Sequence, residues 1–167
     1  EIIDGLEWLG ISPDEGPVYG GEYGPYRQTE RREIYQQHAW KLVEKGSAFP
    51  CFCTPDRLER VRQEQLAHKE NPRYDGTCRR LDLDEARRRV TTGDKYVVRF
   101  KMPKEGSTTA VDLLRGSITI ENTALDDSIL LKSDGLPTYH MAAMVDDHLM
   151  KITHVIRGSE WLSTFAL

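Results

Sequence analysis

Apolar positions recur every three to four residues through the first 90 residues, a spacing typical of amphipathic helices. This spacing predicts helices at residues 2–9, 30–45, 54–69, and from Asp82 or Asp84 to Val90. A glycine follows three of these segments, as it often does at a helix C-terminus: Gly10, Gly46 and Gly93. The short apolar segment 48–53 lies between two of the helices and predicts a buried strand.

From Lys95 onward the period changes to two, which is typical of half-buried strands. We expect these strands at residues 96–101, 108–113, 117–121 and 128–132. The chain therefore begins as α/β, continues as an α+β module and returns to α/β. A nucleotide-binding sheet that is split by an inserted module has this order of elements.

The segment TYHMAAMVDDHLMKITHVIRGSEWL, residues 138–162, predicts a helix, a turn, a short apolar strand ending at Arg157, and a turn into another helix. In an open α/β sheet, ligands bind in the crevice at the carboxyl ends of the strands. An arginine there suits a carboxylate or a phosphate, because its planar guanidinium donates two parallel hydrogen bonds. This segment therefore predicts an anion-binding site.

Composition narrows the class of protein. The chain has 167 residues, 38% hydrophobic and 30% charged, which is typical of a soluble globular domain or two small ones. Its net charge of −4 excludes a generally basic surface but leaves room for a local basic patch. No apolar run approaches the roughly 20 residues of a membrane span. Both ends lie inside helical patterns, so we expect an internal piece of a longer protein.

Several motifs give the chain a family resemblance. GLEWLGISPDEGP, GPYRQTERREIY, CFCTPDRL, PRYDGTCR, YVVRFKMP, LLKSDGLPTYHMA, VDDHLM and THVIRGSEWL follow one another along the chain. In this order they resemble the glutamyl-tRNA synthetases of the bacterial and organellar type, which are class I aminoacyl-tRNA synthetases. The resemblance implies a ligase with L-glutamate, ATP and tRNA(Glu) as partners. The HIGH and KMSKS motifs of the family are absent, so we expect no aminoacylation by this chain alone.

The resemblance also implies a fold, an α/β Rossmann-type catalytic domain interrupted by an α+β connective insertion that binds the tRNA acceptor stem. Residues 1–50 would end the first Rossmann half, residues 51–125 would form the insertion, and residues 126–167 would begin the second half. We expect a monomer without membrane contact, in the mitochondrial matrix or the bacterial cytoplasm. The GSEWL sequence and Ala143 favour the organellar type.

The family places its glutamate pocket on positions that match Tyr139, His140, Met141, Ala142, Ala143 and Arg157. Arg157 would face a carboxylate of the amino acid. Ala143 stands where many bacterial members have asparagine, so one polar contact of the family is missing here. The alternatives are that Tyr139 is a half-buried core aromatic and that Arg157 forms a surface ion pair.

ATP, which enters with Mg²⁺ as a substrate, would contact Glu160 and Trp161 by the same resemblance. Glu160 would bind the ribose, and its alternative role is an acidic residue that complements a helix dipole. Trp161 would pack on the adenine side or, alternatively, in the core. The implied reaction needs positioning and charge stabilisation more than a protein nucleophile, and we expect no catalytic nucleophile.

Cys51, Cys53 and Cys78 cannot all form disulfides with one another, which favours a reducing compartment and thiols kept for a metal or for core packing. Zinc-binding members of the family share the spacing Cys-x-Cys followed by 24 residues and a third Cys. Tetrahedral zinc needs a fourth ligand. Some members place a histidine where this chain has Arg80, which cannot bind zinc, and some relatives use a tyrosine at the position of Tyr74. The alternative is a small hydrophobic cluster of three reduced thiols.

Arginines are concentrated in the expected insertion, where they could contact RNA phosphates. Glutamates alternate with them, so a solvated helix surface is the alternative explanation. Arg79 and Arg80, beside the cysteines, are the best RNA-binding candidates. Two other functions remain open, a shorter paralogue that glutamylates queuosine in tRNA and a non-catalytic RNA-binding module.

Overall fold

The computed structural model describes residues 2–164. The helices are α1 (Ile2–Trp8), α2 (Arg32–Glu44), α3 (Pro55–Ala67), α4 (Leu83–Thr91) and α5 (Tyr139–Leu149). The strands are β1 (Ala48–Cys51), β2 (Val97–Phe100), β3 (Ser107–Asp112), β4 (Gly116–Glu121) and β5 (Ile129–Leu131). Short 3₁₀ helices are η1 (Gln28–Arg31), η2 (Thr77–Arg80), η3 (Asn122–Ala124) and η4 (Ser159–Thr164). All helices and strands predicted between residues 2 and 149 are therefore confirmed, most with slightly shorter bounds.

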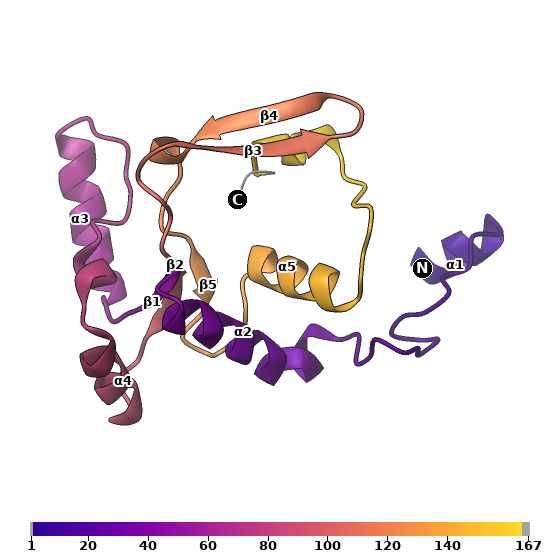
Figure 1. Cartoon of the computed structure of the whole chain (residues 1–167), viewed down its shortest axis with the longest axis horizontal. Helices are drawn as coiled ribbons and strands as arrows, with labels where there is room; N and C mark the ends of the chain where they lie inside the picture. Colours follow the sequence, from indigo (N-terminus) through magenta and orange to yellow (C-terminus); the bar gives the residue numbers. More distant parts are fainter. Residues whose placement is uncertain (1, 165–167) are drawn as a thin grey trace.

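Three strands form an antiparallel sheet in which β2 lies between β1 and β5 (Figure 1). Helix α2 contacts β1 and β5, and α5 packs against both α2 and β5. The two helices bury their apolar faces here together with residues of all three strands. This main core consists of Tyr35, Ala39, Val43, Ala48, Val98, Leu130, Leu131, Met141, Ala142 and Val145.

A second, smaller core lies on the other face of β1. Side chains alternate between the two faces of a strand, so Ala48 reaches the main core while Phe49 and Cys51 reach the smaller one. There they pack against Tyr74 and Cys78, from the segment that ends in η2. Both faces of β1 are covered, which explains why every residue of this strand is buried.

Strands β3 and β4 form a separate antiparallel hairpin that extends away from the sheet (Figure 1). The Asp112 carboxylate accepts hydrogen bonds from the backbone N–H groups of Leu114 and Arg115, both at 2.8 Å, and thereby shapes the turn. Gly116 completes it with a φ of +78°, a conformation that glycine adopts without steric cost. The side chains of Leu113 and Leu114 at the tip are exposed.

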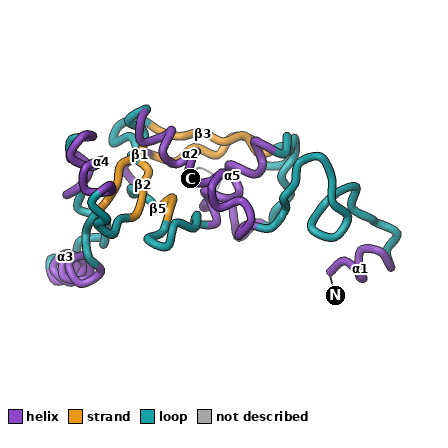
Figure 2. Tube along the Cα trace, turned by 90° about the horizontal axis from the view of Figure 1, so that it is seen from below, coloured by secondary structure: helices purple, strands orange, loops and turns teal. Residues whose placement is uncertain are grey.

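Helix α1 lies at the opposite end of the molecule from α3 and α4 in both views (Figures 1 and 2). None of its described residues is buried, and a long loop joins it to η1. Helix α3 also buries no residue. Among the described residues, no helix is long and apolar enough to cross a membrane.

The predicted strand ending at Arg157 is wrong. Residues 151–157 form neither helix nor strand, and each of them is exposed. A strand needs a neighbour for its backbone hydrogen bonds, and no described segment pairs with this one. All strand pairs within residues 2–164 are antiparallel, so the expected crevice at the ends of parallel strands is absent from this part of the chain. The predicted helix after Arg157 begins as η4, and residues 165–167 lie outside the described range.

The domain boundaries remain a prediction. Strand β1 runs across the boundary placed between residues 50 and 51, and β5 lies beyond residue 125. All three predicted segments therefore contribute a strand or part of a strand to the same sheet.

A buried charge cluster joins the N-terminal part of the chain to α5. The Arg31 guanidinium, with a side chain 3% exposed, donates through Nε to Asp146 Oδ1 at 2.8 Å. The Tyr35 hydroxyl donates to the other carboxylate oxygen, also at 2.8 Å. Arg31 donates further to the carbonyl oxygen of Pro25 at 2.9 Å. The cluster thus ties the 23–25 loop, α2 and α5 together.

Replacing Asp146 by alanine should destabilise the fold by about 3 kcal/mol, because it leaves the buried Arg31 charge unpaired. Urea unfolding followed by circular dichroism measures this difference. Asp147→Ala is the matched control on the same helix, and it should change the free energy of unfolding by no more than about 0.5 kcal/mol. Equal effects of the two substitutions would contradict a stabilising role of the Arg31–Asp146 ion pair.

Candidate functional site

The start of α5 is anchored to β5. Thr138 donates a backbone hydrogen bond to Leu130 O at 2.8 Å, and its hydroxyl donates to Ile129 O at 2.9 Å. Leu131 forms an isolated bridge with Pro137, which closes the turn between the two elements. The first residue of α5, Tyr139, is therefore held at a fixed place beside the sheet.

Tyr139 is the centre of a cluster of predicted pocket residues. Its side chain is 57% exposed, and its ring centroid lies 5.9 Å from that of Trp161. The Arg157 guanidinium carbon lies 5.5 Å from the Tyr139 ring centroid, within cation–π range. The structure thus brings together three residues that the sequence assigned to adjoining glutamate and ATP sites. Tyr139 and Trp161 are not core aromatics, and Arg157 forms no ion pair within residues 2–164.

Glu160 lies beside this cluster, at the first turn of η4. Its carboxylate lies so close to Gly158 that a Cβ at that position would require the Glu160 side chain to move aside. The glycine of the Arg-Gly-Ser-Glu sequence therefore allows the acidic group to approach the backbone beside Arg157. One arginine and one carboxylate are presented from the same short, exposed segment.

The remaining predicted glutamate-binding residues are distributed around α5. Met141 and Ala142 are buried in the main core, so their side chains serve packing. His140 and Ala143 are half-buried, and the His140 ring centroid lies 5.6 Å from that of Tyr139. The glutamate-binding roles of all four residues remain predictions.

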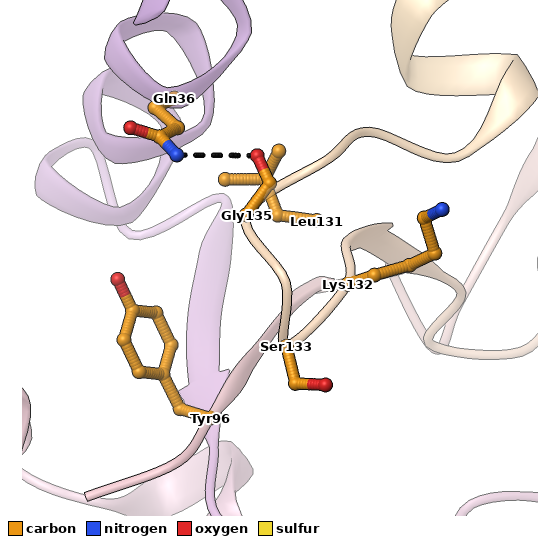
Figure 3. Close-up of a pocket in the computed structure, with 6 residues that line it drawn as sticks. All are labelled: Gln36, Tyr96, Leu131, Lys132, Ser133 and Gly135. Carbon is orange, nitrogen blue, oxygen red and sulfur yellow. Dashed lines mark hydrogen bonds between the residues drawn. The ribbon is translucent and has the colours of Figure 1, made fainter. Parts of the chain in front are cut away.

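A small cavity lies beside the turn that precedes α5, lined by Gln36, Tyr96, Leu131, Lys132, Ser133 and Gly135 (Figure 3). The Gln36 amide crosses it and donates to Gly135 O at 3.2 Å. Its volume of about 60 Å³ is far below that of small-molecule pockets, which are on the order of 300 Å³ or more. This cavity is too small for glutamate or ATP.

The three thiols form a compact group in the smaller core. The sulfur atoms of Cys51, Cys53 and Cys78 all lie within 4.8 Å of one another. The Tyr74 hydroxyl oxygen lies 3.4 Å from Cys51 Sγ and 3.7 Å from Cys53 Sγ. The backbone N–H of Cys78 donates to that oxygen at 2.8 Å. Four donor atoms from two separate segments therefore face one another.

Their spacing fits a tetrahedral metal. A Zn–S bond of about 2.3 Å and a Zn–O bond of about 2.0 Å place tetrahedral sulfur pairs about 3.8 Å apart and oxygen–sulfur pairs about 3.5 Å apart. The distance between Cys53 Sγ and Cys78 Sγ is 3.7 Å, and both Tyr74 distances are close to the second value. Three sulfurs and one phenol oxygen at these distances are therefore a donor set that fits zinc.

Polar neighbours determine the protonation of the thiols. Hydrogen bonds with Cys78 and Tyr74 lower the pKa of the Cys51 thiol to about 4. The same bond to Cys51 raises the pKa of Cys78, whereas burial is the main cause that raises the pKa of Tyr74. Of the coupled pair, Cys51 is therefore the thiol that ionises more readily, and Cys78 the one that keeps its proton more firmly.

A buried arginine completes the surroundings of Tyr74. The Arg99 guanidinium carbon lies 4.2 Å from the Tyr74 ring centroid, and its Nη1 donates to Asp127 O at 2.9 Å. The Arg99 Nε is buried and has no hydrogen-bond partner among the described residues. A fixed positive charge therefore lies on the inner side of the thiol cluster.

Arg79 and Arg80, the predicted RNA-binding pair, have different surroundings. Arg79 forms an ion pair with Asp127, whose side chain is 1% exposed, and donates to Met102 O at 2.8 Å. Arg80 is exposed and forms no ion pair or hydrogen bond within residues 2–164. The structure gives Arg79 a structural role, and RNA binding by either residue remains a prediction.

Known proteins with similar sequences show the family of this chain. Residues 1–166 match the model of the family described as tRNA synthetases class I (E and Q), catalytic domain. The chain belongs to this family. A glutamate–tRNA ligase of Stutzerimonas stutzeri is 57% identical to it over 97% of the chain, and one of Cellvibrio japonicus is 53% identical over 98%. The chain spans about one third of the length of these relatives, 33% and 32%.

Solved structures of the family agree in fold. A glutamate tRNA ligase from Elizabethkingia meningosepticum, in complex with its amino acid, is 41% identical and superposes with a TM-score of 0.89 over 99% of the chain. The synthetase from Elizabethkingia anophelis gives a TM-score of 0.87. The chain covers 34% and 35% of these two proteins. The fold is therefore that of a class I synthetase catalytic domain, as the motifs predicted.

Besides the Arg79–Asp127 pair, two further interactions escaped the sequence analysis. One is the Arg31–Asp146 pair, whose partners are separated by 115 positions. The other is a set of hydrogen bonds from Arg57 to Asp75 and Thr77. Arginines and aspartates are common throughout the chain, so no local pattern distinguishes these pairs from solvated charges.

Arg79→Ala should lower the free energy of unfolding by roughly 3 kcal/mol, because the buried Asp127 carboxylate loses its main cation. Arg80→Ala, one residue further on, should change it by less than about 0.5 kcal/mol. Urea denaturation of both variants measures the difference. Equal stabilities would mean that Lys104, 3.4 Å from the same carboxylate oxygen, is a sufficient partner for Asp127.

Proposed function

We propose that this protein is the part of a glutamate–tRNA ligase that carries one side of the glutamate and ATP site. The observation behind this proposal is the 57% identity to a glutamate–tRNA ligase over nearly the whole chain. The parent enzyme would activate L-glutamate with ATP and Mg²⁺ and transfer it to tRNA(Glu). This chain would contribute the cluster of Tyr139, Arg157, Trp161 and Glu160.

The chemistry of the cluster supports this assignment. Arg157 offers a guanidinium with two parallel N–H donors, which matches the geometry of a carboxylate. The exposed Tyr139 ring offers a flat surface against which the aliphatic part of an amino acid would pack. Glu160 offers an acceptor for ribose hydroxyl groups, as acidic residues do in related nucleotide-binding folds.

The reaction would proceed in two displacements. A carboxylate oxygen of glutamate attacks the α-phosphorus of ATP, and pyrophosphate leaves. A hydroxyl of the terminal tRNA ribose then attacks the carbonyl carbon of the glutamyl adenylate, and AMP leaves. Both steps depend on holding reactants in line rather than on a protein nucleophile. Arg157 would hold one glutamate carboxylate while the other reacts.

Zinc would be held by Cys51, Cys53, Tyr74 and Cys78. With four protein ligands the site is closed, so a bound ion would act as a structural cross-link between β1 and the 74–78 turn. It would fix this turn and η2 beside the sheet. RNA binding by Arg80 at the exposed end of η2 would depend on that position.

The relatives reported above are bacterial, which supports the bacterial cytoplasm over the mitochondrial matrix as the compartment. The three free thiols are consistent with a reducing environment. The monomeric state remains a prediction.

A chimera tests the ligase assignment. The present chain would replace the matching third of the Stutzerimonas stutzeri glutamate–tRNA ligase, and charging would be followed with labelled glutamate and tRNA(Glu). We expect glutamate on the terminal ribose. Labelled product on a queuosine base, or tRNA binding without any charging by a folded chimera, would instead favour one of the two other functions.

Within this chimera, Arg157→Ala should lower kcat/KM for glutamate roughly 100-fold, because a charged hydrogen-bonding partner of the substrate is lost. The KM for ATP should change little. Lys45→Ala, at the exposed end of α2, is the control and should charge as the parent does. Unchanged glutamate kinetics in the Arg157 variant would remove this residue from the pocket.

Metal analysis of the purified chain tests the zinc site. We expect about one zinc per chain, lost in Cys78→Ser because a neutral hydroxyl is a much weaker ligand than a thiolate. Cys53→Ser should behave in the same way. If the purified chain contains no metal and does not take up added zinc, the zinc site is rejected. Cys51, Cys53 and Cys78 are then a cluster of reduced thiols.

A further inference from the structure

Arg57 connects the two segments that supply the cluster of thiols and Tyr74. It lies in the first turn of α3, where the Thr54 hydroxyl accepts a hydrogen bond from its backbone N–H. Its Nη1 donates to Cys53 Sγ at 3.5 Å. Its guanidinium also forms an ion pair with Asp75, one residue after Tyr74. A single side chain therefore contacts a sulfur from one segment and the turn from the other.

Hydrogen bonds within the 74–78 turn hold it in position for this contact. Arg57 donates to the Thr77 hydroxyl at 2.6 Å, and that hydroxyl donates to Asp75 Oδ2 at 2.8 Å. The Thr77 backbone N–H donates to Asp75 Oδ1. Three polar groups thus fix the loop between Tyr74 and Cys78, the two residues that this segment brings to the cluster.

We propose that Arg57, with Asp75 and Thr77, is a positioning group for the metal centre, and that it determines how firmly the site retains its ion. This inference rests on the proposed zinc site. Side chains that orient metal ligands typically contribute 10- to 100-fold to metal affinity. Here the guanidinium would hold the Cys53 thiolate in place and keep the Tyr74–Cys78 turn from moving away.

The position of Arg57 supports a role at the cluster rather than in the core. No residue of α3 is fully buried, and the half-buried Arg57 side chain makes its hydrogen bonds to Cys53, Asp75 and Thr77 rather than to residues of the main core. Arg60, one turn further along α3, is exposed and forms no hydrogen bond or ion pair among the described residues. It is the matched control for the same change on the same helix.

The experiment compares Arg57→Gln, Arg57→Lys, Asp75→Asn and Arg60→Gln in the full chain. Each protein is loaded with zinc, and transfer of the ion to a coloured chelator is followed over time. We expect at least 10-fold faster release from Arg57→Gln, an intermediate rate from Arg57→Lys and Asp75→Asn, and an unchanged rate from Arg60→Gln. Circular dichroism shows whether each variant is folded. If Arg57→Gln does not fold, Asp75→Asn still tests the proposal.

Cobalt substitution provides the second measurement. The thiolate-to-cobalt charge-transfer band depends on hydrogen bonds to sulfur, so we expect it to shift in Arg57→Gln and not in Arg60→Gln. Zinc release and cobalt spectra equal to those of the parent in the Arg57 and Asp75 variants would overturn the positioning role while leaving the zinc site in place. If the parent chain bound neither ion, the zinc site and this inference would both be rejected.

Discussion

The buried ion pair between Arg31 and Asp146 is the interaction on which the position of the candidate pocket depends. It joins residues 115 positions apart and fixes α5 against η1, the turn that leads into α2. A charge as deeply buried as Arg31 is costly unless it is paired, so the chain must bring these elements together to fold. Tyr139, at the other end of α5, is held in place as a consequence.

The central sheet separates two environments with different chemistry. On one face, α2 and α5 form an apolar core. On the other, Cys51 and Tyr74 lie with Cys78 and a buried guanidinium from β2, that of Arg99. The cluster around Tyr139 adjoins the first environment, and the thiol cluster belongs to the second.

Local patterns were sufficient for most elements. The apolar spacing of α2 and α5 and the alternation in β3 and β4 each specify one face, so the sequence predicts them directly. The prediction of a strand before Arg157 was wrong for a physical reason. Its apolar residues have strand character, but strand formation also requires a paired neighbour, which the described segments do not provide.

Some features of the candidate site could likewise be predicted from the sequence, and others could not. Family motifs identified the residues around Tyr139 and the four potential zinc ligands, and the structure places each set close together. The partners of Arg31, Arg57 and Arg79 could not be predicted, because an ion pair across the fold leaves no periodic trace in the sequence. Arg79 illustrates this limit, since its partner Asp127 is buried although nothing around that residue indicates it.

The contact between Cys53 and Cys78 has a further consequence for the segment between them. It brings together the ends of a loop of 24 residues that contains α3, a helix with no buried side chain. Closing such a loop removes conformational entropy from the chain, and the cost rises only slowly with loop length. The loop that carries α3 is thus tethered at both ends, and Leu58 of this helix packs against the smaller core.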